Sequence, residues 1–322
     1  MNDLAAAALL GIVQGLTEFL PVSSTAHLVL ISEALGLDPQ RFGLSFDVAL
    51  HLGTALAVLL YFARTWVELA RDVLHLRLRM PLLVVFGTLP AALAGVALQS
   101  QIESGFRAPA WIAAFLIIGS LIFIAAERFT VARRPLESIG FIDALVLGIA
   151  QAIALLPGIS RSGITISAGL YQGIRRADAT RFSFLLATPV IVGAGAKTLL
   201  DARKAEALFA APDVLAVGFF LSFLFGLLAV AFMVRFLRSH SLIWFVPYRL
   251  IVAALAIALA LAGEPIVIRC TDESADFPKR NGGLSCGPGD RRRVGCIGPG
   301  RSRLQGASPA DRSAQRACAA RA

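Results

Sequence analysis

A carboxylate, hydroxyls and an imidazole, from which an activated nucleophile can be built, lie close together near the start of the chain. They fall within Gln14 to His27 (QGLTEFLPVSSTAH). Gln14 and Glu18 are four residues apart and so share one face of a helix. Pro21 ends that helix, and Ser24 and His27, three residues apart, share a face of the next one. We therefore expect Glu18 to face Ser24 and His27 across the break. A carboxylate, a hydroxyl and an imidazole in contact are the parts of a general-base or activated-nucleophile system.

A second stretch, Gln151 to Thr165 (QAIALLPGISRSGIT), echoes the first and is one residue shorter between Gln and Pro. A turn at Pro157-Gly158 precedes a helix start that carries a guanidinium and several hydroxyls. Free N–H groups at a helix start, together with arginine, form an anion site suited to phosphate. The predicted substrate-binding residues are Gln14 and Ser23 in the first stretch and Gly158, Ser160, Ser162, Gly163 and Thr165 in the second, around a catalytic Arg161.

Structural interpretations compete with these roles. Ser23 and Ser160 suit helix caps. Gly158 and Gly163 equally suit helix packing, and the hydroxyl of Thr165 equally suits a bond to its own helix backbone. The side chain of Gln14 could bond backbone groups that the helix break leaves without partners. Glu18, His27 and Arg161 could form a buried ion network that joins the two stretches. A charge inside a bilayer costs roughly 2.5–3.5 kcal/mol, which favours function for these three. His51, four residues after Asp47, is interpreted as part of a structural pair.

The composition indicates an all-α polytopic membrane protein. Hydrophobic residues make up 57% of the chain and charged residues 16%, too few to cover a soluble surface. The net charge of +9 arises mainly from short basic segments between apolar runs, so membrane orientation explains it and nucleic acid is not an expected partner. All four cysteines lie beyond residue 269, at spacings that match no zinc template.

The elements that must position the two stretches are broken, re-entrant helical hairpins. Apolar half-segments at 4–20 and 24–36, and again at 140–156 and 162–171, flank the proline breaks. Six apolar runs of spanning length separate and follow them, at 46–62, 81–100, 110–126, 181–198, 214–234 and 241–262. A hairpin followed by three spans therefore occurs twice, at about 4–126 and 140–262. Three crossings reverse the chain direction, so an inverted-topology repeat is expected, with a site near the membrane midplane.

Arginines are distributed unevenly between the two sides of this topology. The segments 63–80, 127–139, 175–181 and 235–240 are rich in arginine, whereas the opposite side holds only Arg41, Arg107, Arg203 and Lys204. The positive-inside rule places the arginine-rich side in the cytoplasm and both termini in the periplasm of a bacterial inner membrane. The first residues have no basic region typical of a signal peptide.

The character of the sequence changes after Ala262. Residues 263–322 are rich in Gly, Pro, Arg and Ser and show no apolar period. We interpret 1–262 as the membrane domain and 263–322 as a disordered tail or an anomalous, out-of-frame one. The sequence is compatible with a homodimer but does not determine the oligomeric state.

GLTEFLPVSSTAH together with PGISRSGIT resembles the undecaprenyl-diphosphatase family that is associated with bacitracin resistance, over about 1–262. The resemblance implies an integral membrane phosphatase that converts a C55 isoprenyl diphosphate to its monophosphate, recycles the carrier for peptidoglycan synthesis and faces the periplasm. It implies functional roles for the two motifs and a divalent cation, Mg²⁺ or Ca²⁺. Gln14 stands where the family also has Glu, which leaves Glu18 as the one obvious carboxylate for a metal.

Two other function classes share part of this residue pattern. Inverted repeats with broken helices also build transporters, and a carrier or flippase for a lipid phosphate or an anion would need Arg161 but not Ser24 and His27. Lipid phosphate phosphatases of another class need a second histidine with an aspartate, which does not follow the Ser-Arg motif. Within the hydrolase interpretation, Ser24 attacks phosphorus with His27 as proton shuttle, or water attacks directly with Ser24 as a ligand.

Overall fold

The computed structural model describes residues 2–39, 41–200 and 211–263, and these residues are almost entirely helical. The predicted tail, 263–322, lies outside the described residues except for Gly263. Arg203 and Lys204, which were used to assign the sides of the membrane, also lie outside them. Residues Met1–Leu261 belong to one compact unit, which contains every element discussed below except the last two residues of the final helix.

The helices follow the apolar pattern of the sequence closely. The first half contains α1 (Asp3–Phe19), α2 (Ser24–Ala34), α3 (Leu44–Tyr61), α4 (Ala63–Leu74), α5 (Arg79–Gly105) and α6 (Pro109–Phe129). After a short 3-10 turn, η1 (Leu136–Ser138), the second half contains α7 (Phe141–Ile153), α8 (Arg161–Tyr171), α9 (Arg176–Leu200), α11 (Pro212–Phe236), η2 (Leu242–Phe245) and α12 (Val246–Gly263).

The described residues contain five helices that are long and apolar enough to cross a membrane. A sixth candidate is the bent pair Ser45–Tyr61 and Ala63–Leu74, whose two parts make an angle of 74°. These candidates correspond to the six predicted spans, and the two hairpins appear as the pairs α1–α2 and α7–α8. The prediction of an all-α polytopic membrane protein is confirmed.

The segment 63–80 is the clearest correction to the secondary structure. We expected a basic loop, but residues Ala63–Leu74 form helix α4. Trp66 and Leu69 are at helical spacing on its inner side, whereas Arg64 and Arg71 are exposed. Such an amphipathic basic helix suits the boundary between lipid and water. Arg64 and Arg71 are therefore held on a helix, not in a loop.

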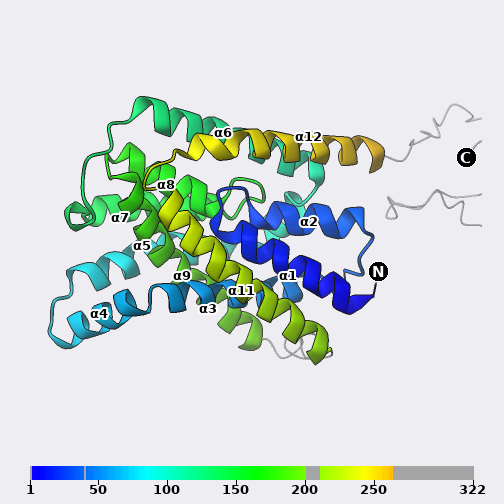
Figure 1. Ribbon diagram of the computed structural model, residues 1–322, viewed down its shortest axis with the longest axis horizontal. Helices are drawn as coiled ribbons and strands as arrows, with labels where there is room; N and C mark the ends of the chain where they lie inside the picture. The colour runs from blue at the N-terminus through cyan, green and yellow to red at the C-terminus, as the bar shows by residue number, and fades with distance from the viewer. Residues whose placement is uncertain (1, 40, 201–210, 264–322) are drawn as a thin grey trace, which may run out of the picture. The chain divides into compact units, whose positions relative to one another are not determined.

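The two halves use the same packing pattern. α1 packs against α2, α3 and α11, and the corresponding α7 packs against α8, α9 and α5 (Figure 1). A glycine lies three residues before the first glutamine of each stretch, and each is at a close helix contact: Gly11 faces Gly218 of α11, and Gly148 faces Gly87 of α5. Small residues let helix backbones approach closely in membranes. The sequence echo therefore has a structural counterpart beyond the two proline breaks.

Candidate active site

The two breaks share an uncommon backbone conformation. Ser23 and Ser160 each directly precede the second helix of their hairpin, with φ of 73° and 75°. A residue other than glycine in this left-handed region costs on the order of 1–3 kcal/mol, and such residues cluster at functional sites. Both turns are therefore held in place by their surroundings, at equivalent positions of the two halves.

The tips of the two hairpins bind each other directly. Ser23 Oγ accepts a hydrogen bond of 3.0 Å from Gly158 N, and Ser162 Oγ donates one of 3.2 Å to the carbonyl of Leu20. Ser160 caps α8 as expected, because its Oγ accepts from Gly163 N at 3.4 Å. The prediction that Ser23 caps α2 is wrong, since its side chain makes no capping bond there and instead joins the hairpins.

Glu18 is the centre of the site and its side chain is only 2% exposed. Ser24 Oγ donates to Glu18 Oε2 at 2.6 Å, and Gln14 Nε2 donates to the same oxygen at 2.9 Å. Arg161 of the other hairpin forms an ion pair with Glu18 Oε1. The expected juxtaposition of Gln14, Glu18 and Ser24 with Arg161 is therefore present. A serine hydroxyl on a carboxylate at this distance makes a charge-assisted hydrogen bond.

The histidine beside Glu18 is not the expected one. His51 Nε2 lies 3.5 Å from Glu18 Oε2, and its Nδ1 bonds the carbonyl of Asp47 at 2.7 Å. His27 instead bonds the carbonyl of Ser23 through Nδ1 at 2.7 Å and the hydroxyl of Tyr248 through Nε2 at 2.8 Å. The prediction that His27 faces Glu18 and Ser24 is wrong, since both of its ring nitrogens have these other partners.

Arg249 is a residue that the sequence analysis missed. Its side chain is 0% exposed, the largest of the fully buried side chains among the described residues. The guanidinium donates to the carbonyl of Pro21 in the first hairpin and to those of Gly158 and Ile159 in the second, at 2.9–3.3 Å. An arginine in the middle of the apolar run 241–262 was the signal that could have identified it.

Further bonds fix Arg249 on α6. It donates to the carbonyl of Leu116 and to Ser120 Oγ, both at 3.0 Å, and its charge lies 4.6 Å from the centre of the Phe123 ring. A guanidinium over an aromatic face is attractive. Arg249 therefore ties both hairpin turns to the same helix, without contacting Glu18.

Packing accounts for the two glycines of the predicted anion site. Gly158 has φ of 112° and its Cα lies against α6, where any Cβ would meet the carbonyl of Ile112 at 2.7 Å. A Cβ on Gly163 would overlap the Phe123 ring. The hydroxyl of Thr165 bonds the carbonyl of Arg161 and Ser183 Oγ. These three residues therefore lie near Arg161, but the two glycines pack against α6 and the Thr165 hydroxyl bonds Ser183 of α9.

Glu18, Arg161 and Ser162 line a small cavity together with Phe19 and three residues of α9. The three residues of α9 are Ser183, Phe184 and Ala187. The cavity is too small to hold a water molecule, and Glu18 and Arg161 form an ion pair in its wall. A phosphate that binds here must therefore compete with Glu18 for Arg161.

The donor set at this site does not fit a cation held by protein alone. The part of the chain that the structure describes contains no group of three His, Cys, Asp or Glu residues suited to a metal. Glu18 is already bound by Ser24, Gln14 and Arg161. Mg²⁺ usually needs one or two carboxylates in addition to substrate phosphates. The Mg²⁺ or Ca²⁺ implied by the resemblance and Glu18 as its ligand both stay predictions.

Comparison with known proteins gives the family. The undecaprenyl-diphosphatase of Rubrobacter xylanophilus is 46% identical over 273 residues, which cover 81% of this chain and 100% of that protein. The undecaprenyl-diphosphatase of Thermodesulfovibrio yellowstonii is 41% identical over 261 residues, covering 80% and 98% of the two chains. That of Corynebacterium diphtheriae is 42% identical over 266 residues, covering 79% and 93%.

These matches and the site lie in the same part of the chain. The sequence model of the family described as bacitracin resistance protein BacA matches residues 7–255, a range that contains the turns of both hairpins and Arg249. The chain is therefore a member of the BacA family of bacitracin resistance proteins.

Proposed function

We propose that this protein hydrolyses undecaprenyl diphosphate to undecaprenyl phosphate and phosphate, as the names of its relatives indicate for them. This reaction recycles the lipid carrier of cell-wall synthesis and confers bacitracin resistance. The observation that carries the proposal is the Glu18 carboxylate, which binds Ser24 Oγ and pairs with Arg161. It places a potential base, a nucleophile and an anion-binding group together at the junction of the two hairpins.

In the first step, Ser24 Oγ attacks the terminal phosphorus and its proton passes to Glu18. The substrate phosphate takes the place of Glu18 at Arg161, which frees the carboxylate to act as base. The Oγ–P bond forms, the phosphoanhydride P–O bond breaks, and undecaprenyl phosphate leaves as an anion. Arg161 stabilises the charge on the transferring phosphoryl group. In the second step, water attacks the phosphoserine, and Glu18 returns its proton to Ser24 Oγ as phosphate leaves.

We assign His27 a positioning role in this scheme in place of a direct shuttle. Its bonds to the Ser23 carbonyl and to Tyr248 connect the turn before Ser24 to α12. The strained turn at Ser23 sets the direction in which Ser24 leaves the helix start. Gln14 and His51 complete the surroundings of the carboxylate at Oε2. Ser23 and Ser162 hold the two hairpin tips together, and Ser160 caps the helix start at which the phosphate binds.

The membrane orientation follows the arginines. We propose that the ends of the spans that carry Arg64, Arg128, Arg181 and Arg238 face the cytoplasm, on the basis of the positive-inside rule. Both ends of the membrane domain and the entrance to the first hairpin would then face the periplasm of a bacterial inner membrane. The homodimer stays a prediction.

Phosphate release from undecaprenyl diphosphate, measured on purified protein in detergent with Mg²⁺, tests the function. We expect activity in the wild type and a loss of roughly 10²–10⁴-fold in Glu18→Ala and Ser24→Ala, as for the removal of a base or nucleophile. Glu33→Ala and Ser100→Ala change exposed side chains of the same types and should keep wild-type rates. A folded wild type that releases no phosphate would contradict the hydrolase and favour a carrier for lipid phosphate.

A further inference from the structure

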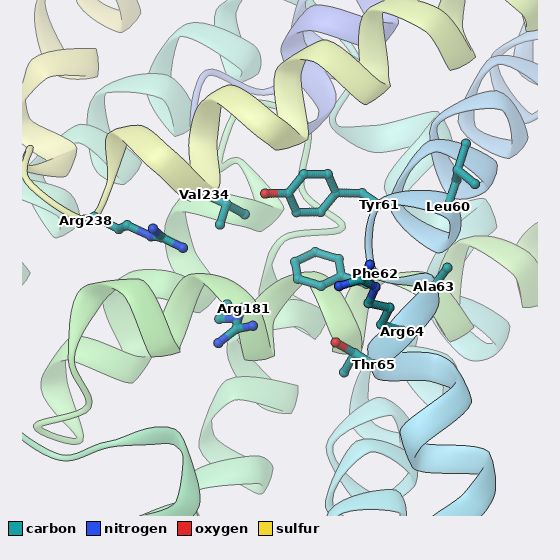
Figure 2. Close-up of a pocket in the computed structure, with 9 residues that line it drawn as sticks. All are labelled: Leu60, Tyr61, Phe62, Ala63, Arg64, Thr65, Arg181, Val234 and Arg238. Atoms are coloured by element: carbon teal, nitrogen blue, oxygen red, sulfur yellow. The ribbon is translucent and has the colours of Figure 1, made fainter.

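A second cavity lies away from the hairpins, where the end of α3 meets the start of α4. It has a volume of about 390 Å³, which is within the usual range for small-molecule sites. Parts of α9, the end of α11 and the turn that follows α11 complete its wall (Figure 2). The lining residues are Leu60, Tyr61, Phe62, Ala63, Arg64, Thr65, Arg181, Val234 and Arg238.

Three arginines line this cavity and no acidic residue does. In Figure 2, Arg181 and Arg238 lie on one side of the space and Arg64 lies on the other, below the rings of Tyr61 and Phe62. None of the three guanidinium groups has a hydrogen bond or ion pair with another described residue. Three like charges around one space repel one another, and an anion between them removes that repulsion.

The cavity lies at the ends of three membrane spans. The candidate spans Ser45–Tyr61 and Pro212–Phe236 end here, and the span Arg176–Thr198 begins here. Arginine and tyrosine at span ends are characteristic of the level of lipid headgroups. Leu60 is 54% exposed beside the cavity, and Phe62 and Val234 add apolar wall. A charged headgroup and the start of an acyl chain both have matching surface at this position.

The cavity is separate from the candidate active site. Phe62, which lines it, contacts Phe184 with ring centres 6.4 Å apart, and Phe184 contacts Phe19 at 5.3 Å. Phe19 and Phe184 in turn line the small cavity beside Glu18 and Arg161. A layer of three aromatic rings therefore stands between the two sites, and an anion bound at one does not contact the residues of the other.

We propose that this cavity binds a phosphate group carried on a lipid, through Arg64, Arg181 and Arg238, with the lipid chain against Leu60 and the adjoining apolar surface. The site is distinct from the hydrolytic site and does not depend on the proposed reaction. Free phosphate offers the same anionic chemistry without the chain, and the apolar wall at the membrane edge favours the lipid.

Isothermal titration calorimetry tests the proposal. The purified full chain in detergent is titrated with dioctanoyl phosphatidic acid. We expect binding by the wild type and a Kd at least about tenfold weaker in the triple variant Arg64→Gln, Arg181→Gln, Arg238→Gln, because charge-assisted bonds to phosphate are lost. The matched control is the triple variant Arg71→Gln, Arg77→Gln, Arg128→Gln. It removes the same charge from exposed arginines that do not line the cavity.

Both triple variants should elute as the wild type does and keep phosphatase activity, which shows that they are folded. Equal weakening in the control triple would mean non-specific attraction to basic surface and would overturn the proposal. Equally tight binding of dioctanoyl phosphatidylcholine would contradict recognition of the phosphate charge. Inorganic phosphate that binds as tightly as the lipid, with the same dependence on the three arginines, would assign the site to free phosphate and overturn the lipid assignment.

Discussion

Arg161→Lys is expected to lower the rate of phosphate release by roughly 10²–10³-fold, although the positive charge is kept. Arg161 reaches Glu18 through Nη2 and the carbonyl of Ala187 through Nη1, the latter at 3.5 Å. A planar guanidinium binds phosphate with two parallel hydrogen bonds, whereas an ammonium is a single point charge. Lysine therefore keeps part of the attraction for the substrate but loses the geometry that stabilises the transferring phosphoryl group.

Steady-state kinetics with undecaprenyl diphosphate measure this effect, and we expect most of it in kcat. Arg107→Lys is a matched control, because Arg107 also pairs with a carboxylate, at 2.9 Å, but its partner is Asp47 and its side chain is more exposed than that of Arg161. The control should stay within about threefold of the wild type, as expected for a partly exposed ion pair. Full activity in a folded Arg161→Lys protein would contradict the phosphoryl-stabilising role.

Arg249→Met is expected to destabilise the membrane domain and to abolish activity, although Arg249 contacts no group that takes part in the chemistry. The substitution leaves the carbonyls of Pro21, Gly158 and Ile159 without the donor that Arg249 provides in a buried region. Each buried acceptor that is left unsatisfied typically costs about 1–3 kcal/mol. The two hairpin turns also lose their common attachment, so Ser24 and Arg161 are no longer held in register.

Thermal unfolding in detergent, followed by circular dichroism, gives the stability of this variant. We expect a transition at least several degrees lower than that of the wild type, together with loss of phosphate release. Arg128→Met removes an exposed arginine from α6 and should leave both quantities unchanged. A variant at Arg249 with the wild-type transition and wild-type rate would show that the hairpins are held together by other contacts.

Much of the site could be predicted because its residues are local to the two breaks. Glu18 and Ser24 are six residues apart around a proline, so the turn itself brings them together. Arg161 follows from the echo of the first motif in the second half. The spans were predictable because a bilayer requires about 20 apolar residues per crossing, and the chain contains six such runs.

The wrong and missed assignments depend on contacts between distant segments. Whether His27 or His51 approaches Glu18 is decided by the position of α3 and α12 around the hairpins, which spacing within one motif does not report. Ser23 joins the hairpins because the amide of Gly158, in the other half of the chain, lies within hydrogen-bond distance of its hydroxyl, whereas the serine type alone equally favours a cap. Gly163 is explained by the ring of Phe123, 40 residues away in sequence.

Helix α4 was missed for a different reason. Its arginines suggested a loop, while the apolar spacing of Trp66, Leu69 and Val73 on one side of the segment is the pattern of an amphipathic helix. Arg249 was missed although a charge inside an apolar span is itself a signal of function or of a buried network. Both features are visible in the sequence as charged residues within or beside an apolar span.

Trapping a phosphoserine at Ser24 tests most directly the claim that Glu18 activates this hydroxyl. Purified protein is mixed with undecaprenyl diphosphate labelled at its terminal phosphate, quenched in acid within one turnover and digested for mass spectrometry. We predict a labelled peptide phosphorylated at Ser24, formed by the wild type and not by Glu18→Gln. A Ser24→Ala protein that releases phosphate at the wild-type rate, with no labelled peptide in the wild type, would contradict the covalent step and assign the attack to water.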